Sequence, residues 1–176
     1  MVARPATDPT TATAASRSDA EIALELGRIV EVEAALAAYK VELVAGLAAR
    51  RPDCLDRQVG QPGAASPDWL PGVENPPAPG VSEFFADELA MILNCSRTAA
   101  SVLADHAGML VDRLPGTWAA LADGRLDWPR ARALAAELTA PAREVEPALI
   151  AAVEAAVLPR AAGGRCPGCG RRCGPS

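Results

Sequence analysis

The sequence contains few aromatic residues and almost no histidine. Aromatic side chains make up 3% of the 176 residues, and His106 is the single histidine. A nuclease-type site that uses histidine as both base and metal ligand needs further ligands, and His106 falls on a predicted helix with no second ligand at a suitable spacing. The chain also has no phosphate-binding glycine loop and no nucleophile elbow. We therefore assign no catalytic residue or small-molecule substrate, expect a protein that is not an enzyme, and expect His106 to be at the surface or half-buried.

Long apolar runs and an excess of positive charge are also missing. No run approaches the roughly 20 apolar residues that a membrane span requires, and residues 1–17 lack the apolar core of a secretory signal. The 22 acidic residues outnumber the 17 basic ones, and the net charge of −5 argues against strong non-specific attraction to nucleic acid. We expect a cytoplasmic protein without a membrane partner, in which any contact with DNA is local.

The residues that are abundant favour helices. Half of the sequence is hydrophobic, with alanine, leucine and valine prominent, and no alternating strand pattern of useful length occurs. We predict an all-α fold, a multi-helix domain over residues 18–163 with a long N-terminal amphipathic helix and a helix-turn-helix-like core. Residues 1–17 are expected to be a disordered start.

The long helix is predicted over residues 18–51, about 50 Å at 1.5 Å per residue. Ser18 and Glu21 form a capping-box pattern at its start. Apolar residues then recur at steps of three or four, at Ile22, Leu26, Ile29, Val32, Leu36, Tyr39, Leu43 and Leu47. Two interpretations fit this stripe: an arm that pairs with another copy or docks a partner, or an ordinary helix packed on its own domain.

Residues 52–81 are predicted to be a connector. Residues 52–80 contain seven prolines, Pro52 included, which is too many for a helix interior. Trp69 in this segment either packs back onto the domain or anchors a loose tether. The helical core is then expected over residues 82–158.

Residues 84–110 have the pattern of two short helices joined by a tight corner at Asn94 and Cys95. Ser96 is placed to cap the second helix. The positions expected to face inward are Phe85, Leu89, Ile92 and Leu93 in the first helix, and Ala99, Ala100, Leu103, Ala107 and Leu110 in the second. A recognition helix contacts DNA with its early turns, and the candidate DNA-binding residues are therefore Ser96, Arg97, Thr98 and Ser101.

Three further helices are predicted from their start signals. Pro115 begins the first, which ends at Gly124, and Asp127 caps the second, with Pro129 in its first turn. The third spans residues 147–158. The apolar positions that these helices offer are Trp118, Leu121, Leu134, Leu138, Leu149, Val153 and Val157.

Several short motifs occur together in this core. They are residues 87–90 (DELA), 96–97 (SR), 113–115 (RLP), 124–128 (GRLDW) and 131–134 (ARAL). With them the chain resembles, over residues 18–163, the bacterial domain of unknown function family 222, which includes the thirteen-E-twelve repeat proteins. The resemblance implies a helical domain that precedes an HNH endonuclease domain. This chain, without that domain, is then expected to be a non-catalytic module recruited to DNA or to a partner.

The second helix of the pair departs from the family pattern. Family members carry a more arginine-rich helix there, whereas the exposed face here keeps Arg97 and adds Asp105. A carboxylate repels phosphate, so DNA association through this helix is expected to be weak. A corner used only for packing fits the pattern equally well.

Residues 164–176 form a tail rich in Cys, Gly and Arg. Cys166 and Cys169 form a C-x-x-C pair and Cys173 follows four residues later, a zinc-knuckle shape that lacks a fourth ligand. One hypothesis is a zinc site at these three cysteines. The other is a truncated copy whose tail is read out of frame, because the resemblance predicts a polar helix here. Apart from this zinc, no cofactor is expected.

Overall fold

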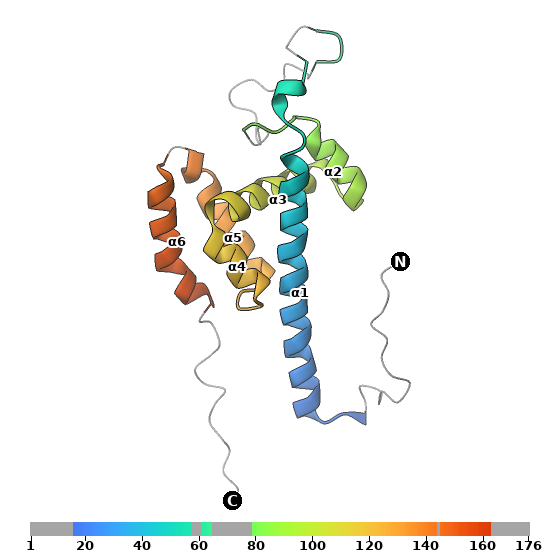
Figure 1. Cartoon of the computed structure of the whole chain (residues 1–176). Coiled ribbons are helices and arrows are strands. Elements are labelled where there is room, and N and C mark those ends of the chain that lie inside the picture. Colours follow the sequence, from blue (N-terminus) through green and yellow to red (C-terminus); the bar gives the residue numbers. More distant parts are fainter. Residues whose placement is uncertain (1–15, 58–60, 65–78, 144, 163–176) are drawn as a thin grey trace, which may run out of the picture.

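The computed structural model describes residues 16–57, 61–64, 79–143 and 145–162, and these residues form an all-α domain (Figure 1). Its helices are α1 (Asp19–Ala48), α2 (Phe85–Leu93), α3 (Arg97–Gly108), α4 (Pro115–Ala122), α5 (Trp128–Thr139) and α6 (Pro147–Ala162). A π-helical turn, Met109–Arg113, continues α3, and short 3₁₀ turns occupy Asp53–Leu55 and Pro141–Arg143. The predicted all-α class is confirmed. The predictions for residues 1–15, Trp69 and the cysteine tail lie outside the described residues.

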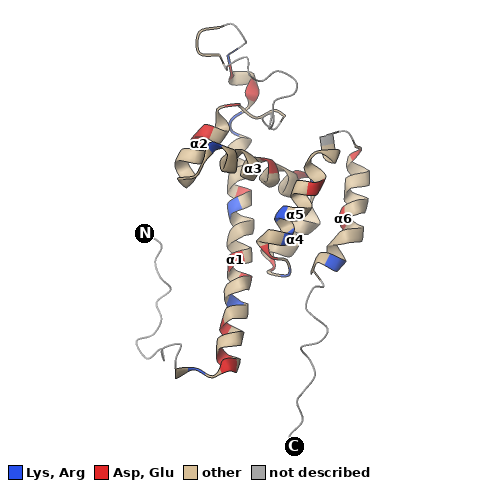
Figure 2. Ribbon diagram, turned by 180° about the vertical axis from the view of Figure 1, so that it is seen from behind, with Lys and Arg blue, Asp and Glu red and all other residues tan. Residues whose placement is uncertain are grey.

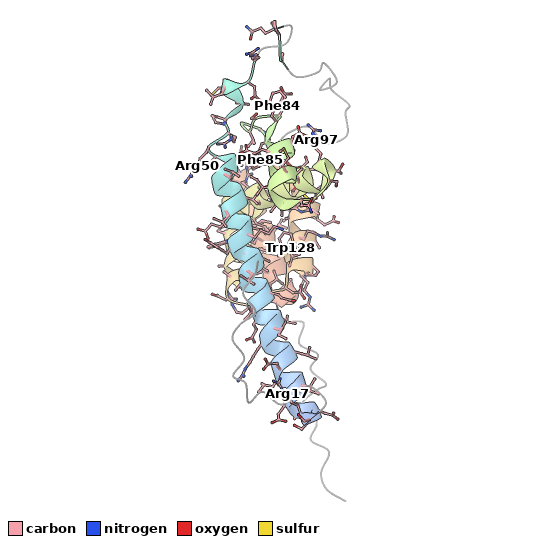
Figure 3. All side chains as sticks on the ribbon, turned by 90° about the vertical axis from the view of Figure 1, so that its right-hand side faces the viewer. Arg17, Arg50, Phe84, Phe85, Arg97 and Trp128 are labelled. Atoms are coloured by element: carbon pink, nitrogen blue, oxygen red, sulfur yellow. The ribbon has the colours of Figure 1, made fainter. Side chains whose placement is uncertain are left out.

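Helix α1 begins at the predicted capping box. The Ser18 hydroxyl accepts a hydrogen bond from the Glu21 backbone N–H at 3.4 Å, and the Glu21 carboxylate accepts one from the Ser18 backbone N–H at 2.8 Å. The bond from the Ser18 backbone N–H, together with one that the Ser18 hydroxyl donates to the same carboxylate at 2.8 Å, holds the pKa of Glu21 below its ordinary value. The helix is about 45 Å long, and its C-terminal half packs against α3 and α4, whereas its N-terminal half extends past the other helices (Figures 1 and 3).

The core lies between the C-terminal half of α1 and the helices α3, α4 and α5. Its largest fully buried apolar side chains are Leu89, Leu110, Leu114, Leu121, Leu126 and Val41. Helix α1 contributes through its small residues, because the positions buried on it are Ala34, Ala38, Val41 and Val44. Small side chains let the neighbouring helices approach closely, and the Trp118 indole N–H donates to the Ala38 carbonyl at 3.3 Å.

The predicted apolar stripe of α1 therefore does not face the core. Of its eight positions, Ile22 and Leu47 are half-buried, and the other six are exposed. The prediction of an amphipathic helix missed that α1 has two apolar faces. The face of small residues packs on the domain, and the face of large residues is left outside.

Three single-residue predictions were also wrong. Ile92 is exposed, whereas Ala90 and Leu93 in the same turn of α2 are half-buried against the core. Ala99 is exposed, because the buried face of α3 centres on Ala100 and Ala107. His106 is buried rather than superficial, since α5 covers the side of α3 on which it lies.

Three further helix ends agree with the start and stop residues predicted from the sequence. Asn94 ends α2 in the left-handed conformation with a φ of 51°, and Gly124 follows α4 with a φ of 69°. The Asp127 carboxylate accepts from the Arg130 backbone N–H at 2.9 Å and caps α5. In the part of the chain that the structure describes, no helix is long and apolar enough to cross a membrane.

Candidate functional site

The four predicted DNA-binding residues lie at the start of α3. The Ser96 hydroxyl caps the helix by accepting from the Ala99 backbone N–H at 3.2 Å. Arg97 and Thr98 are exposed, and Ser101 is half-buried. Arg97 does not point freely into solvent, because its Nε lies 2.9 Å from Oδ1 of Asp87 on α2. The corner thus brings together the predicted residues but neutralises their one positive charge.

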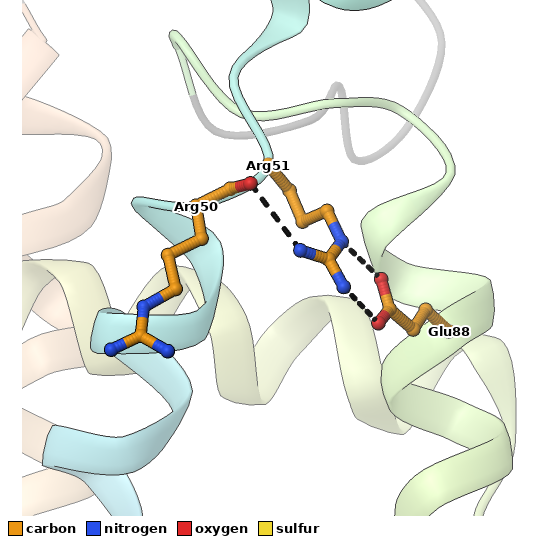
Figure 4. A network of polar contacts seen from close by, with 3 residues as sticks. All are labelled: Arg50, Arg51 and Glu88. Carbon is orange, nitrogen blue, oxygen red and sulfur yellow. Dashed lines mark hydrogen bonds and ion pairs between the residues drawn. The ribbon is translucent and has the colours of Figure 1, made fainter.

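A second arginine near this corner is also paired. Arg51 follows α1 and donates two hydrogen bonds to the carboxylate of Glu88 on α2, at 2.8 Å and 2.7 Å, and a third to the Arg50 carbonyl at 3.3 Å (Figure 4). The hydrogen bonds from Arg51 hold the pKa of Glu88 below its ordinary value. Arg51 and Arg97 are therefore both paired with carboxylates of α2.

A cavity of about 530 Å³ next to the corner is lined mainly by acidic side chains among its charged residues. It lies between the C-terminal end of α1, the chain before α2, and α3. Four acidic residues line it, and Arg97 is the one basic residue among its described lining residues; the acidic ones are Glu42, Glu83, Asp105 and Asp112. This cavity does not suit an anionic ligand.

The large apolar residues of α1 form an exposed stripe along one side of the helix. We call this surface the outer face, and it consists of Leu26, Ile29, Val32, Leu36, Tyr39 and Leu43. Each of these side chains is between 46% and 61% exposed. Within the stripe, Ile22, Ile29, Leu36 and Leu43 recur every seven residues, which is the spacing at which helices pair side by side.

The N-terminal half of α1 is strongly acidic. Residues 19–33, the acidic arm, carry five carboxylates and one arginine, and none of them is buried. The acidic residues are Asp19, Glu21, Glu25, Glu31 and Glu33. Figure 2 shows Asp and Glu gathered toward this end of the helix. The arm is therefore an exposed helix with apolar residues on several sides and a negative charge.

A second cavity, of about 460 Å³, lies where α1 meets α3 and α5. We call it the groove, and its lining residues are Ala37, Lys40, Val41, Leu93, Cys95, Ala99, Val102, Leu103, His106, Trp128 and Arg132. None of these described lining residues is acidic, and two are cationic. The groove adjoins the outer face because Lys40 follows Leu36 by four residues and precedes Leu43 by three. Figure 3 shows Trp128 beside the middle of α1.

His106 lines the groove with 7% of its surface exposed. Its Nδ1 has no hydrogen-bond partner in the described part of the chain. Burial lowers the pKa of His106, and the charge of Arg132 lowers it further. The ring is therefore neutral near pH 7, and the positive charge of the groove comes from Lys40 and Arg132.

The predicted metal ligands Cys166, Cys169 and Cys173 lie outside the described residues. Within the described ranges, no three His, Cys, Asp or Glu side chains are grouped so that they could hold a metal ion. Cys54 and Cys95 are exposed free thiols.

Comparison with known families identifies the helical core. Residues 73–167, just over half of the chain, match the family model described as Domain of unknown function (DUF222). The chain belongs to the DUF222 family. The match begins after α1, so the outer face and the acidic arm precede the part that defines the family here. No curated protein and no solved structure matches the chain.

Sequence reasoning missed the groove, although two signals for it were present. Lys40 interrupts the apolar stripe of the long helix, and Arg132 belongs to the 131–134 motif. What could not be read from the sequence is that α5 lies beside α1, which places the two cations on the same cavity.

Proposed function

We propose that this DUF222 protein is a non-catalytic protein-interaction module that self-associates through the outer face of α1. The observation that supports this most directly is the exposure of six large apolar side chains on one side of a single helix. Large contiguous apolar surfaces on folded proteins are usually contact sites for other proteins. The seven-residue spacing within the stripe favours another helix as the contact.

The charges of the domain favour assembly over DNA binding. The net charge is −5, and Arg51 and Arg97 at the corner are both paired with carboxylates. The family resemblance predicts that such modules work beside HNH nuclease domains. Self-association would then bring two of those domains together without the module itself contacting DNA.

Sedimentation velocity of the full chain, from low micromolar to submillimolar concentration, tests the proposal. We expect the wild type to sediment as a species heavier than the 18.1 kDa monomer as its concentration rises. Leu36→Glu should weaken this association by about tenfold or more, because an unpaired carboxylate would be buried in the contact.

Leu24→Glu is the matched control. Leu24 lies on the same helix and is 59% exposed, close to the 61% of Leu36, but it points about 120° away from Leu36 around the helix axis. This variant should associate like the wild type, and circular dichroism should show that both variants keep their helices. A wild type that stays monomeric at every concentration, or equal weakening by both variants, would show the proposal to be wrong.

A further inference from the structure

We infer that two copies of the chain pair antiparallel, with Glu33 at the end of each acidic arm lying at the rim of the other copy's groove. This inference rests on the proposed self-association and adds its direction, its register and a second binding surface. Three features support it: the charged residues within the apolar stripe, the positive charge of the groove, and the exposed side of the arm that carries Leu26, Val30 and Glu33.

Two charged residues interrupt the apolar stripe of α1. Glu33 and Lys40 lie seven residues apart, and both are exposed on the side where the outer face meets the groove. In a parallel, in-register pair these residues flank the seam, and Lys40 would lie opposite Ala35 of the other copy without a carboxylate partner. In an antiparallel pair whose twofold axis passes between Leu36 and Ala37, Glu33 of each copy lies opposite Lys40 of the other. The same register sets Leu26 of one copy opposite Leu47 of the other.

The groove and the arm have complementary charges. Lys40 and Arg132 line the groove, no described lining residue is acidic, and neither cation forms an ion pair within the described part of the chain. The arm carries five carboxylates and one arginine. The opposite charges of Glu33 and Lys40 therefore favour the antiparallel orientation.

The arm also offers a matching face. Leu26, Val30 and Glu33 occupy positions i, i+4 and i+7 and therefore share one side of α1. Leu26 and Val30 are 57% and 50% exposed, so about half of the surface of each is uncovered by the described part of the single chain. In the antiparallel register this side turns toward the groove of the other copy. Val30 and Leu26 would then lie opposite Leu43 and Leu47 of the other copy, and Glu33 would lie at the cationic rim of its groove.

Zero-length carbodiimide cross-linking tests the register, because Lys40 is the only lysine of the chain. The reagent joins an amine directly to a carboxylate. No Asp or Glu lies three or four residues from Lys40, and Glu33 of the same helix is about 10 Å away along the axis. We expect mass spectrometry to find a Lys40–Glu33 link that joins ¹⁴N-labelled and ¹⁵N-labelled chains in a mixture. Absence of this mixed link in a sample that sediments as a dimer would overturn the inference and leave the proposed self-association intact.

Charge exchange provides a second test by sedimentation. Glu33→Lys alone should weaken self-association by about tenfold or more, because two like-charged contacts are created, and E33K/K40E should restore it to within about threefold of the wild type. Arg132→Gln should also weaken it, whereas Arg160→Gln on α6, outside the groove, should not. Failure of the double exchange to restore association, or equal effects of the two arginine variants, would overturn the inference. A wild type that stays monomeric would instead refute the proposed function as well.

Discussion

At the scale of single residues, His106 is the clearest departure from what its neighbourhood in the sequence indicates. The segment around it is an ordinary alanine-rich helix, and the prediction placed the ring at the surface or half-buried. The structure buries it, because α5 crosses α3 and brings Trp128 and Arg132 to the same cavity. A buried ring that is neutral near pH 7 makes the stability of the domain sensitive to mild acid.

We predict that the domain loses stability between about pH 7 and pH 5 through His106. Burial, assisted by Arg132, sets the pKa of the folded ring below its ordinary value of 6.5, so the unfolded chain binds more protons in this range. The stability is fully present above the ordinary value and is lost as the pH falls toward the folded value. Urea denaturation at both pH values measures the loss.

His106→Leu provides the comparison for this prediction. The variant should show a smaller drop in unfolding free energy between the two pH values, whatever its stability at pH 7. Arg132→Gln should reduce the drop in part, because it removes the second cause of the lowered pKa. Carboxylates such as Glu21, whose pKa is lowered from 4.5, contribute mainly at more acidic pH. If wild type and His106→Leu lose the same stability, the ring does not control this range.

At the scale of elements, helix starts were predictable and packing faces were not. Ser18, Ser96 and Asp127 each cap a helix as predicted, because a cap is a contact within four residues of the sequence. Which face of α1 is buried depends on what packs against it. The large stripe was the obvious candidate, but the closer fit is made by small residues such as Ala34 and Ala38.

Another element-scale contact was invisible in the sequence. The N-terminus of α4 has no side-chain cap of its own, and the carboxylate of Glu154 on α6 accepts a hydrogen bond from the Thr117 backbone N–H at 2.6 Å. Glu154 is 9% exposed, and a Cβ at Gly116 would lie 3.3 Å from its carboxylate. A glutamate in the middle of α6 looks like a solvated charge until the fold brings it to the end of α4.

We predict that Glu154→Ala destabilises the domain by about 1–3 kcal/mol, because it leaves a buried backbone N–H without its acceptor. Glu154→Gln should cost less, since the amide oxygen still accepts the bond but no longer carries the charge that suits a helix N-terminus. Glu137→Ala, at an exposed position on α5, is the control and should change stability by no more than about 0.5 kcal/mol. Urea denaturation at pH 7 measures all three. Equal effects of Glu154→Ala and Glu137→Ala would contradict the capping role.

At the scale of the whole molecule, charge separates the two functions that a helical corner allows. The chain carries a net charge of −5, five of its carboxylates lie on the acidic arm of α1, and the proposed pair of chains would double the total. The corner has the outline of a DNA-binding unit, with two helices, an Asn94 turn and a Ser96 cap, but the carboxylates on α2 neutralise its arginines. The arrangement of the helices favours DNA binding, whereas the charge of the corner opposes it. Charge largely determines the affinity of a protein for phosphate.

We predict that the wild type does not shift duplex DNA in a gel at low salt, where phosphate contacts are strongest. Asp87→Asn/Glu88→Gln would remove the carboxylates that are paired with the two corner arginines, so this double variant should bind DNA weakly and lose that binding as salt is added. Glu137→Gln/Glu146→Gln changes the net charge by the same amount away from the corner and should remain without binding. Binding by the corner variant alone would show that the corner has the geometry to contact DNA and lacks only net positive charge. No binding by either variant would show that its geometry is also unsuitable. Salt-sensitive binding by the wild type would show that the paired arginines are accessible to phosphate, and the assembly proposal would then have to include DNA.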